Sequence, residues 1–156
     1  MMQIDIEQRK EKALALFNEG YNCSQSVFCA YADVFELDQE LARRLTSSFG
    51  GGMGRLREVC GALTGSFLLL GLRYPASDPN DKKAKTDNYA SAQRVADDFK
   101  SRFETIICRE LLDVKRQRES PEPSDRNAEY YAKRPCARFV VEAAEIVGRE
   151  MMRIND

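Results

Sequence analysis

Residues Phe49–Tyr74 read FGGGMGRLREVCGALTGSFLLLGLRY and combine a run of glycines, one cysteine and an apolar segment. The apolar segment, Ala62–Leu72, is shorter than the roughly 20 residues of a membrane span, so we expect it to form the buried central helix of a soluble domain. Glycines allow positive φ and close backbone approach, so the preceding loop can fold tightly against the residues around Cys60. Gly61 and Gly65 share a helix face, on which a neighbouring helix can approach closely. The alternative is an ordinary core helix, softened by glycine, with a buried thiol at its start.

Length and composition predict a single domain that spans residues 1–156. Hydrophobic residues make up 43% of the chain, which is enough for a real core. The 24 basic and 25 acidic residues nearly cancel and form no dense basic cluster, which argues against nucleic acid or a membrane as the main partner. The N-terminal sequence MMQIDIEQRKEK has no apolar segment of the secretory type. We therefore expect a cytoplasmic protein with reduced thiols.

Five cysteines and no histidine are the most informative counts. Without histidine the chain has no haem-attachment motif of the C-x-x-C-H kind, no Cys-His or Ser-His catalytic pair and no histidine-containing zinc site. The cysteines are dispersed and never form C-x-x-C, which excludes zinc-ribbon, ferredoxin and thioredoxin motifs. Any thiol site must therefore be assembled by the fold from distant positions, which are Cys23, Cys29, Cys60, Cys108 and Cys136.

A helical period with capping residues at its breaks predicts an all-α, single-domain bundle of about six or seven helices. We predict helices over residues 4–19, 22–35, 38–47, 62–73, 82–102 and 105–114, and a last helix that opens at Arg134-Pro135-Cys136. Residues 115–127 are polar and rich in proline and charge, which is typical of an exposed loop. No strand pattern or internal repeat is evident.

Four cysteines fall at or near a predicted helix N-terminus: Cys23, Cys60, Cys108 and Cys136. Helix N-termini present unpaired N–H groups and a partial positive charge, which favour the thiolate. The thiolate is both the nucleophile and the metal ligand, so this placement favours redox or metal chemistry over simple packing. Cys29 lies mid-helix among apolar residues, and we expect it to belong to the core.

These residues carry a family resemblance. The chain resembles the C_GCAxxG_C_C family of small redox-active proteins, in which Cys23 would be the first cysteine and Cys108 and Cys136 the third and fourth. The resemblance extends from about residue 20 to residue 145, and it implies redox chemistry without naming a substrate. Cys60 would belong to the central hexamer, but this chain reads CGALTG, with Cys and Gly in the reverse order. One residue along a helix corresponds to a rotation of about 100°, so this order affects where Cys60 points.

The leading hypothesis is a thiol-based redox protein whose catalytic residues are Cys23, Cys60, Cys108 and Cys136, and which exchanges disulfides or electrons with a protein redox partner. A second hypothesis is a zinc or iron–sulfur module with four thiolate ligands, although the sequence identifies neither a metal nor another cofactor. A third is a helical scaffold or homo-oligomer with structural cysteines. Whether the protein is an enzyme, and which cysteine attacks, stay open.

The positions of the arginines in the sequence indicate which thiol is the most reactive. Arg134 and Arg138 flank Cys136 and add positive charge, so we predict that Cys136 is the most reactive thiol. Arg55 and Arg57 follow the glycine loop, where they either bind an anion or are simply solvated.

Overall fold

The structure is a computed structural model that describes residues 2–153, of which 65% are helical. The described residues contain no β-strand, so the all-α prediction is confirmed. The α-helices are α1 (Ile6–Asn18), α2 (Cys23–Cys29), α3 (Gln39–Leu45), α4 (Gly50–Met53), α5 (Gly61–Arg73), α6 (Lys82–Phe103), α7 (Cys108–Leu111), α8 (Ala128–Lys133) and α9 (Cys136–Met151). Two short 3₁₀ helices also occur: η1 (Ala32–Phe35) lies between α2 and α3, and η2 (Ser47–Phe49) lies between α3 and α4.

Polar side chains cap the N-termini of several helices. The side chains of Asn22 and Asp38 accept hydrogen bonds from backbone N–H groups in the first turns of α2 and α3. Asp5 and Asp81 do the same for α1 and α6. Seven helices therefore correspond to the predicted ones, and the two short helices α4 and α8 are additions.

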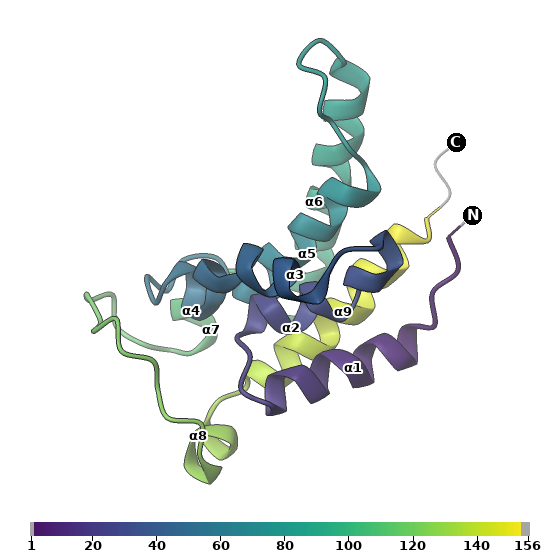
Figure 1. Ribbon diagram of the computed structural model, residues 1–156. Helices are drawn as coiled ribbons and strands as arrows, with labels where there is room; N and C mark the ends of the chain where they lie inside the picture. The colour runs from purple at the N-terminus through teal and green to yellow at the C-terminus, as the bar shows by residue number, and fades with distance from the viewer. Residues whose placement is uncertain (1, 154–156) are drawn as a thin grey trace.

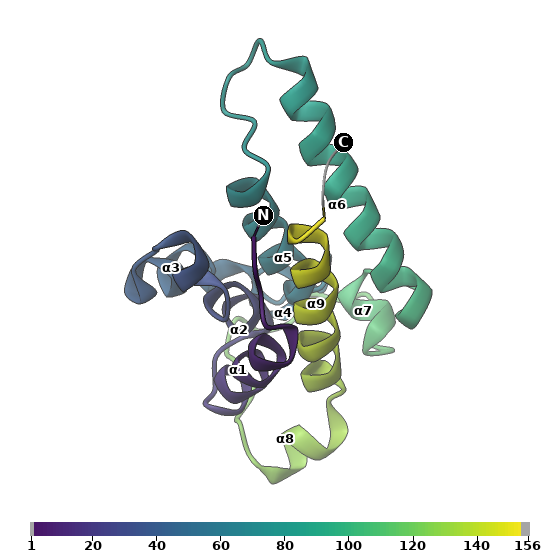
Figure 2. The ribbon, with the colours of Figure 1, turned by 90° about the vertical axis from the view of Figure 1, so that its right-hand side faces the viewer.

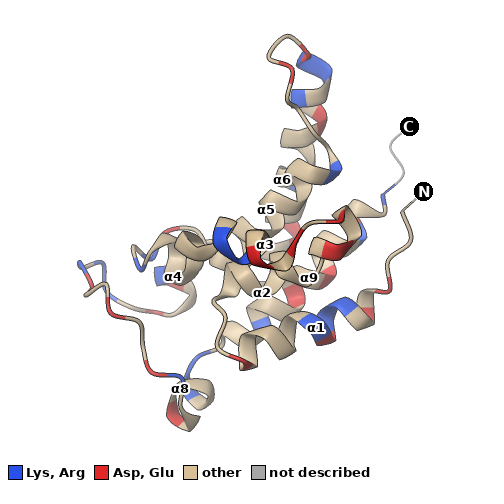
Figure 3. Cartoon of the chain, viewed as in Figure 1, with Lys and Arg blue, Asp and Glu red and all other residues tan. Residues whose placement is uncertain are grey.

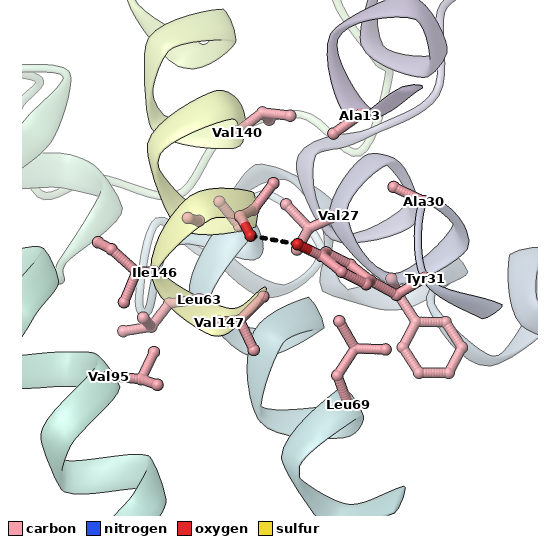
Figure 4. Close-up of a cluster of buried hydrophobic side chains, with 14 of the residues drawn as sticks. Ala13, Val27, Ala30, Tyr31, Leu63, Leu69, Val95, Val140, Ile146 and Val147 are labelled. Atoms are coloured by element: carbon pink, nitrogen blue, oxygen red, sulfur yellow. Dashed lines mark hydrogen bonds between the residues drawn. The ribbon is translucent and has the colours of Figure 1, made fainter. Parts of the chain in front are cut away.

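The prediction of one continuous helix over residues 22–35 is wrong for the second half of that helix. It ends as an α-helix at Cys29, and the chain tightens into η1, where Val34 N–H bonds to Tyr31 C=O at 3.0 Å. The change of winding directs Tyr31 into the core, where its hydroxyl donates a hydrogen bond to the carbonyl of Ala144 in α9 at 2.6 Å (Figure 4). A buried tyrosine needs such a partner, so this contact fixes η1 against α9.

Helix α9 lies at the centre of the molecule and packs against α1, α2, α5 and α6 (Figures 1 and 2). The apolar stripe that faces its neighbours is buried and consists of Phe139, Val140, Ala143, Ile146 and Val147. The apolar face of α5 covers another side of this core, with Leu63, Leu69 and Leu70 fully or almost fully buried. Because α2 and α5 also pack together, the N-terminal ends of α2, α5 and α9 meet on one side of the core.

Helix α6 projects beyond the other helices, with its charged N-terminal end farthest from α9 (Figures 1 and 3). Arg94 of α6 forms a salt bridge at 2.5 Å with Glu150 of α9. Charges of both signs occur along α1 and α6, as the sequence composition led us to expect (Figure 3). Across residues 2–153, we find no helix that combines the length and apolar character required to cross a membrane.

Candidate functional site

Four of the five cysteines line one cavity of about 60 Å³. This thiol cavity has room for a few water-sized groups, because each needs about 10–15 Å³. Its polar lining consists mainly of the four thiols and three guanidinium groups, from Arg57, Arg126 and Arg134. All five cysteines are free thiols, and Cys29 lies in the apolar core outside the cavity.

Two of these thiols are held by the first residues of packed helices. Cys23 opens α2, where Asn22 and Gln25 form a reciprocal capping box with bonds of 2.8 and 3.0 Å. Cys136 opens α9, directly after Pro135. Because α2 and α9 pack together, the Cys23 and Cys136 thiols line the same cavity, and each shifts the pKa of the other.

Cys60 lies just before a helix instead of inside one. It is the N-cap of α5 and has an extended backbone, with φ −54° and ψ 131°. The rotation of about 100° that separates neighbouring helical residues therefore does not describe its direction. The order CGALTG puts Gly61 at the first helical position and leaves Cys60 facing the thiol cavity.

A short antiparallel pairing places Cys108 beside Cys60. Val59 pairs with Ile107, Cys60 N–H bonds to Ile106 C=O at 2.9 Å, and Cys108 N–H bonds to Glu58 C=O at 2.6 Å. Side chains alternate between the two faces of such a pairing, so Cys60 and Cys108 both project on the face opposite Val59 and Ile107. The helix predicted over residues 105–114 is shorter than expected, because α7 is one turn long and its N-cap is Ile107.

The glycine loop has the conformation and the close contacts that its sequence predicts. Gly52 has φ +67°, and a Cβ there would lie 2.6 Å from Cys108 Cβ and 2.7 Å from Arg57 Cα. Only glycine fits this position without displacing Cys108. Three other residues of this segment, Met53, Arg55 and Arg57, also have φ between 58° and 70°. Such left-handed backbone is unfavourable for residues with a side chain and is concentrated beside the thiols.

Arg57 connects the thiols to the loop that follows α7. Its Nη1 donates to Cys108 Sγ at 3.7 Å, and its other nitrogens bind the Glu119 carboxylate at 2.7 and 3.0 Å. Arg55 binds the same carboxylate at 3.0 Å. The prediction that Arg55 and Arg57 are simply solvated is therefore wrong, because an internal carboxylate holds the two side chains. Neither Glu119 nor the Arg57–Cys108 contact was identified from the sequence, since more than fifty residues separate the partners.

The four thiols differ in acidity. The hydrogen bond from Cys23 and the charges of Arg134, Arg57 and Arg126 outweigh burial and lower the pKa of Cys136 to about 7. The same contact with Cys136 raises the pKa of Cys23 well above its usual range. Burial raises the pKa of Cys60 to about 12 and also raises that of Cys108, although Arg57 opposes the change at Cys108. Cys136 is therefore the one cavity thiol that is substantially ionised near neutral pH.

Tyr130 of α8 and two flanking arginines, Arg126 and Arg134, line the thiol cavity on one side. Arg126 donates to the carbonyls of Phe17 and Tyr21 at 2.9 and 3.0 Å, and its guanidinium lies 4.8 Å from the Tyr130 ring centre. The guanidinium of Arg134 lies over the same ring at 5.5 Å. No helix was predicted for residues 128–133. Asn127 begins that helix by accepting a bond from Tyr130 N–H at 2.9 Å.

The metal hypothesis can be compared with the positions of the possible ligand side chains. Within residues 2–153, no three side chains of His, Cys, Asp or Glu are grouped closely enough to hold a metal ion. A Zn(Cys)₄ centre or a cluster needs thiolates that converge on one point. The four sulfurs share a cavity without offering such a preformed ligand set.

The fold and the cavity define an all-α protein in which four thiols line one cavity and one of them has a lowered pKa. A family model described as "Putative redox-active protein (C_GCAxxG_C_C)" matches residues 21–150, and this chain belongs to that family. A segment of 63 residues is also 33% identical to a protein of Archaeoglobus fulgidus described as "Uncharacterized protein". That match covers 40% of this chain and 42% of the archaeal protein, so the chain spans about two-fifths of that relative. No solved structure matches the chain.

Proposed function

We propose that this protein carries out thiol–disulfide exchange, with Cys136 as the attacking thiol and Cys23 as the resolving thiol. The observation that carries the proposal is that these two thiols open two packed helices and line the same cavity, with a lowered pKa at Cys136 and a raised pKa at Cys23. A thiol with a pKa near the ambient pH combines a high thiolate fraction with good nucleophilicity. Cys60 is a poorer candidate for the attacking role because burial keeps it protonated.

In the first step, the Cys136 thiolate attacks one sulfur of a substrate disulfide. A mixed disulfide forms on Cys136 and the first substrate thiolate leaves. Cys23 then gives up its proton, which the departing thiolate or water accepts, and its sulfur attacks Cys136 Sγ. The second substrate thiolate leaves, and a Cys23–Cys136 disulfide remains. Two electrons have passed from the protein to the substrate, and an external dithiol returns them when it reduces the protein.

Ionisation couples these two steps. While Cys136 is a thiolate, the hydrogen bond from Cys23 stabilises it and keeps Cys23 protonated. Once Cys136 has become part of a mixed disulfide it carries no charge, and the pKa of Cys23 is no longer raised by that neighbour. Attack by Cys136 thus prepares Cys23 for resolution. We place this activity in a reducing compartment such as the cytoplasm, where free thiols are the resting state.

The test is disulfide mapping by mass spectrometry after the reduced protein reacts with hydroxyethyl disulfide, a small neutral oxidant. We expect a Cys23–Cys136 bond in the unaltered protein and a trapped mixed disulfide on Cys136 in Cys23→Ser. Cys136→Ser should form neither product, and Cys29→Ser, the matched control, should behave like the unaltered protein. Mixed disulfides that form first on Cys60 or Cys108, or a reaction no faster than that of a free thiol, would refute the assignment.

A further inference from the structure

A second, larger cavity adjoins the thiol cavity. This vestibule has a volume of about 440 Å³ and lies between the glycine loop, the loop that precedes α8, and α8 itself. Six residues line both spaces: Asn22, Gly51, Arg57, Arg126, Tyr130 and Arg134. A group bound in the vestibule is therefore separated from the thiols only by residues that line both the vestibule and the thiol cavity.

The vestibule is strongly basic. Arg55, Arg57, Arg126 and Arg134 line it, and none of its lining residues is acidic. Glu119 neutralises part of this charge by pairing with Arg55 and Arg57. Within residues 2–153, Arg126 and Arg134 form no salt bridge; Arg126 donates to carbonyl groups and Arg134 lies over the Tyr130 ring. Four guanidinium groups against one carboxylate leave about three positive charges around the vestibule.

The dimensions favour a small ligand. The vestibule falls within the range of about 300–1,000 Å³ that is typical of small-molecule sites. The thiol cavity behind it admits only a few atoms, and Cys136 is 8% exposed. A folded partner would have to bring its disulfide through the vestibule to a nearly buried sulfur, whereas the –S–S– group of a small molecule can enter alone. Guanidinium groups match the planar geometry of carboxylates and can bind them bidentately.

We propose that the vestibule binds a low-molecular-weight disulfide that carries carboxylate groups, and presents its sulfur to Cys136. This proposal rests on the exchange function above and names its substrate class. Carboxylates of the ligand lie against Arg126 and Arg134, and the disulfide points into the thiol cavity. The reaction balances as before: one anionic disulfide is reduced to two anionic thiols, and Cys23 and Cys136 become the disulfide of the protein.

The experiment compares three small disulfides of similar size and different charge: dithiodipropionate, a dianion; hydroxyethyl disulfide, neutral; and cystamine, a dication. The rate of Cys136 oxidation in the reduced protein is measured for each and divided by its rate with free mercaptoethanol in the same buffer. Relative to this reference, we expect the dianion to react at least about tenfold faster than the dication, because basic clefts concentrate anions. High salt should reduce that preference.

Arg134→Gln tests the vestibule directly. Removing this charge also changes the ionisation of Cys136, so the readout is the dianion-to-dication rate ratio, in which the thiolate fraction cancels. We expect that ratio to fall roughly threefold to tenfold, as the loss of one nearby charge implies, and Arg134→Lys to restore most of it. Arg138→Gln is the matched control, because Arg138 is equally close to Cys136 in sequence but lies over Phe103, outside the vestibule.

The outcomes separate this proposal from the exchange function. If Cys136 reacts with all three disulfides in the proportions of the free thiol, the exchange function stands and the vestibule proposal is wrong. The same conclusion follows if Arg138→Gln changes the ratio as much as Arg134→Gln. It also follows if small disulfides react slowly while an oxidised dithiol protein reacts fast, since the partner is then a protein. If no disulfide oxidises the Cys23–Cys136 pair, the exchange function itself falls.

Discussion

At the scale of single residues, the proposed chemistry depends on the interaction between the Cys23 and Cys136 thiols. Because Cys23 lowers the pKa of Cys136 chiefly by donating to its thiolate, the two possible replacements of Cys23 should differ. Cys23→Ala removes the donor and should move the midpoint of Cys136 alkylation from about 7 to a higher pH. Cys23→Ser keeps an O–H donor and should move it much less. The measurement is iodoacetamide labelling against pH with site-resolved mass spectrometry; equal midpoints in the two variants would contradict the assigned hydrogen bond.

The same measurement compares Cys136 with Cys29. Burial raises the pKa of Cys29, and its side chain is 1% exposed. A raised pKa means that the thiolate forms only at alkaline pH, so Cys29 should label slowly near neutrality while Cys136 labels fast. The expected rate difference is at least about tenfold, given midpoints more than one unit apart. Labelling of Cys29 as fast as Cys136 in the folded protein would be inconsistent with this ranking.

At the scale of elements, the site depends on how closely α2 approaches α5. A Cβ on Gly65 would lie 2.6 Å from the Ser24 carbonyl oxygen, whereas a Cβ on Gly71, in the same helix, would meet nothing within 4 Å. Gly65→Ala should therefore lower the free energy of unfolding by about 1–3 kcal/mol, because α2 must move away. Gly71→Ala should raise it by about 0.4–1 kcal/mol through helix propensity and reduced unfolded-state entropy.

Chemical denaturation of the two alanine variants checks this pair, and Cys136 labelling adds a functional readout. Displacement of α2 in Gly65→Ala should also move Cys23 away from Cys136 and slow the alkylation of Cys136 at neutral pH. Gly71→Ala should leave that rate unchanged. Equal effects of the two substitutions on stability would show that the close approach of α2 and α5 is not required.

At the scale of the whole molecule, a Cys23–Cys136 disulfide would connect the starts of α2 and α9 and close most of the chain into one loop. Closing a loop of about 100 residues stabilises a protein by up to about 4–5 kcal/mol, and typical values are about 2–4 kcal/mol. For a protein of this size each kcal/mol corresponds to about 2–4 °C. We expect the oxidised protein to melt about 5–15 °C above the reduced one, as followed by circular dichroism. Cys23→Ser and Cys136→Ser should melt at the same temperature with and without oxidant.

The sequence by itself determined the local structure. Caps such as Asn22, the proline before Cys136 and the left-handed glycines of the loop act within a few residues, so their effects could be predicted without the fold. The apolar stripe of α9 likewise predicted its buried face. The pattern also predicted which cysteines lie near helix starts, although α7 is shorter than expected.

Only the tertiary structure decided which thiols meet and how each is ionised. Cys23 is the neighbour of Cys136 because α2 packs on α9. Arg57 is the neighbour of Cys108 because the segments around Val59 and Ile107 pair with each other. These partners are far apart in the chain, so no local period or spacing encodes their contact. Burial and neighbouring charge set a thiol's pKa, and both are properties of the assembled core.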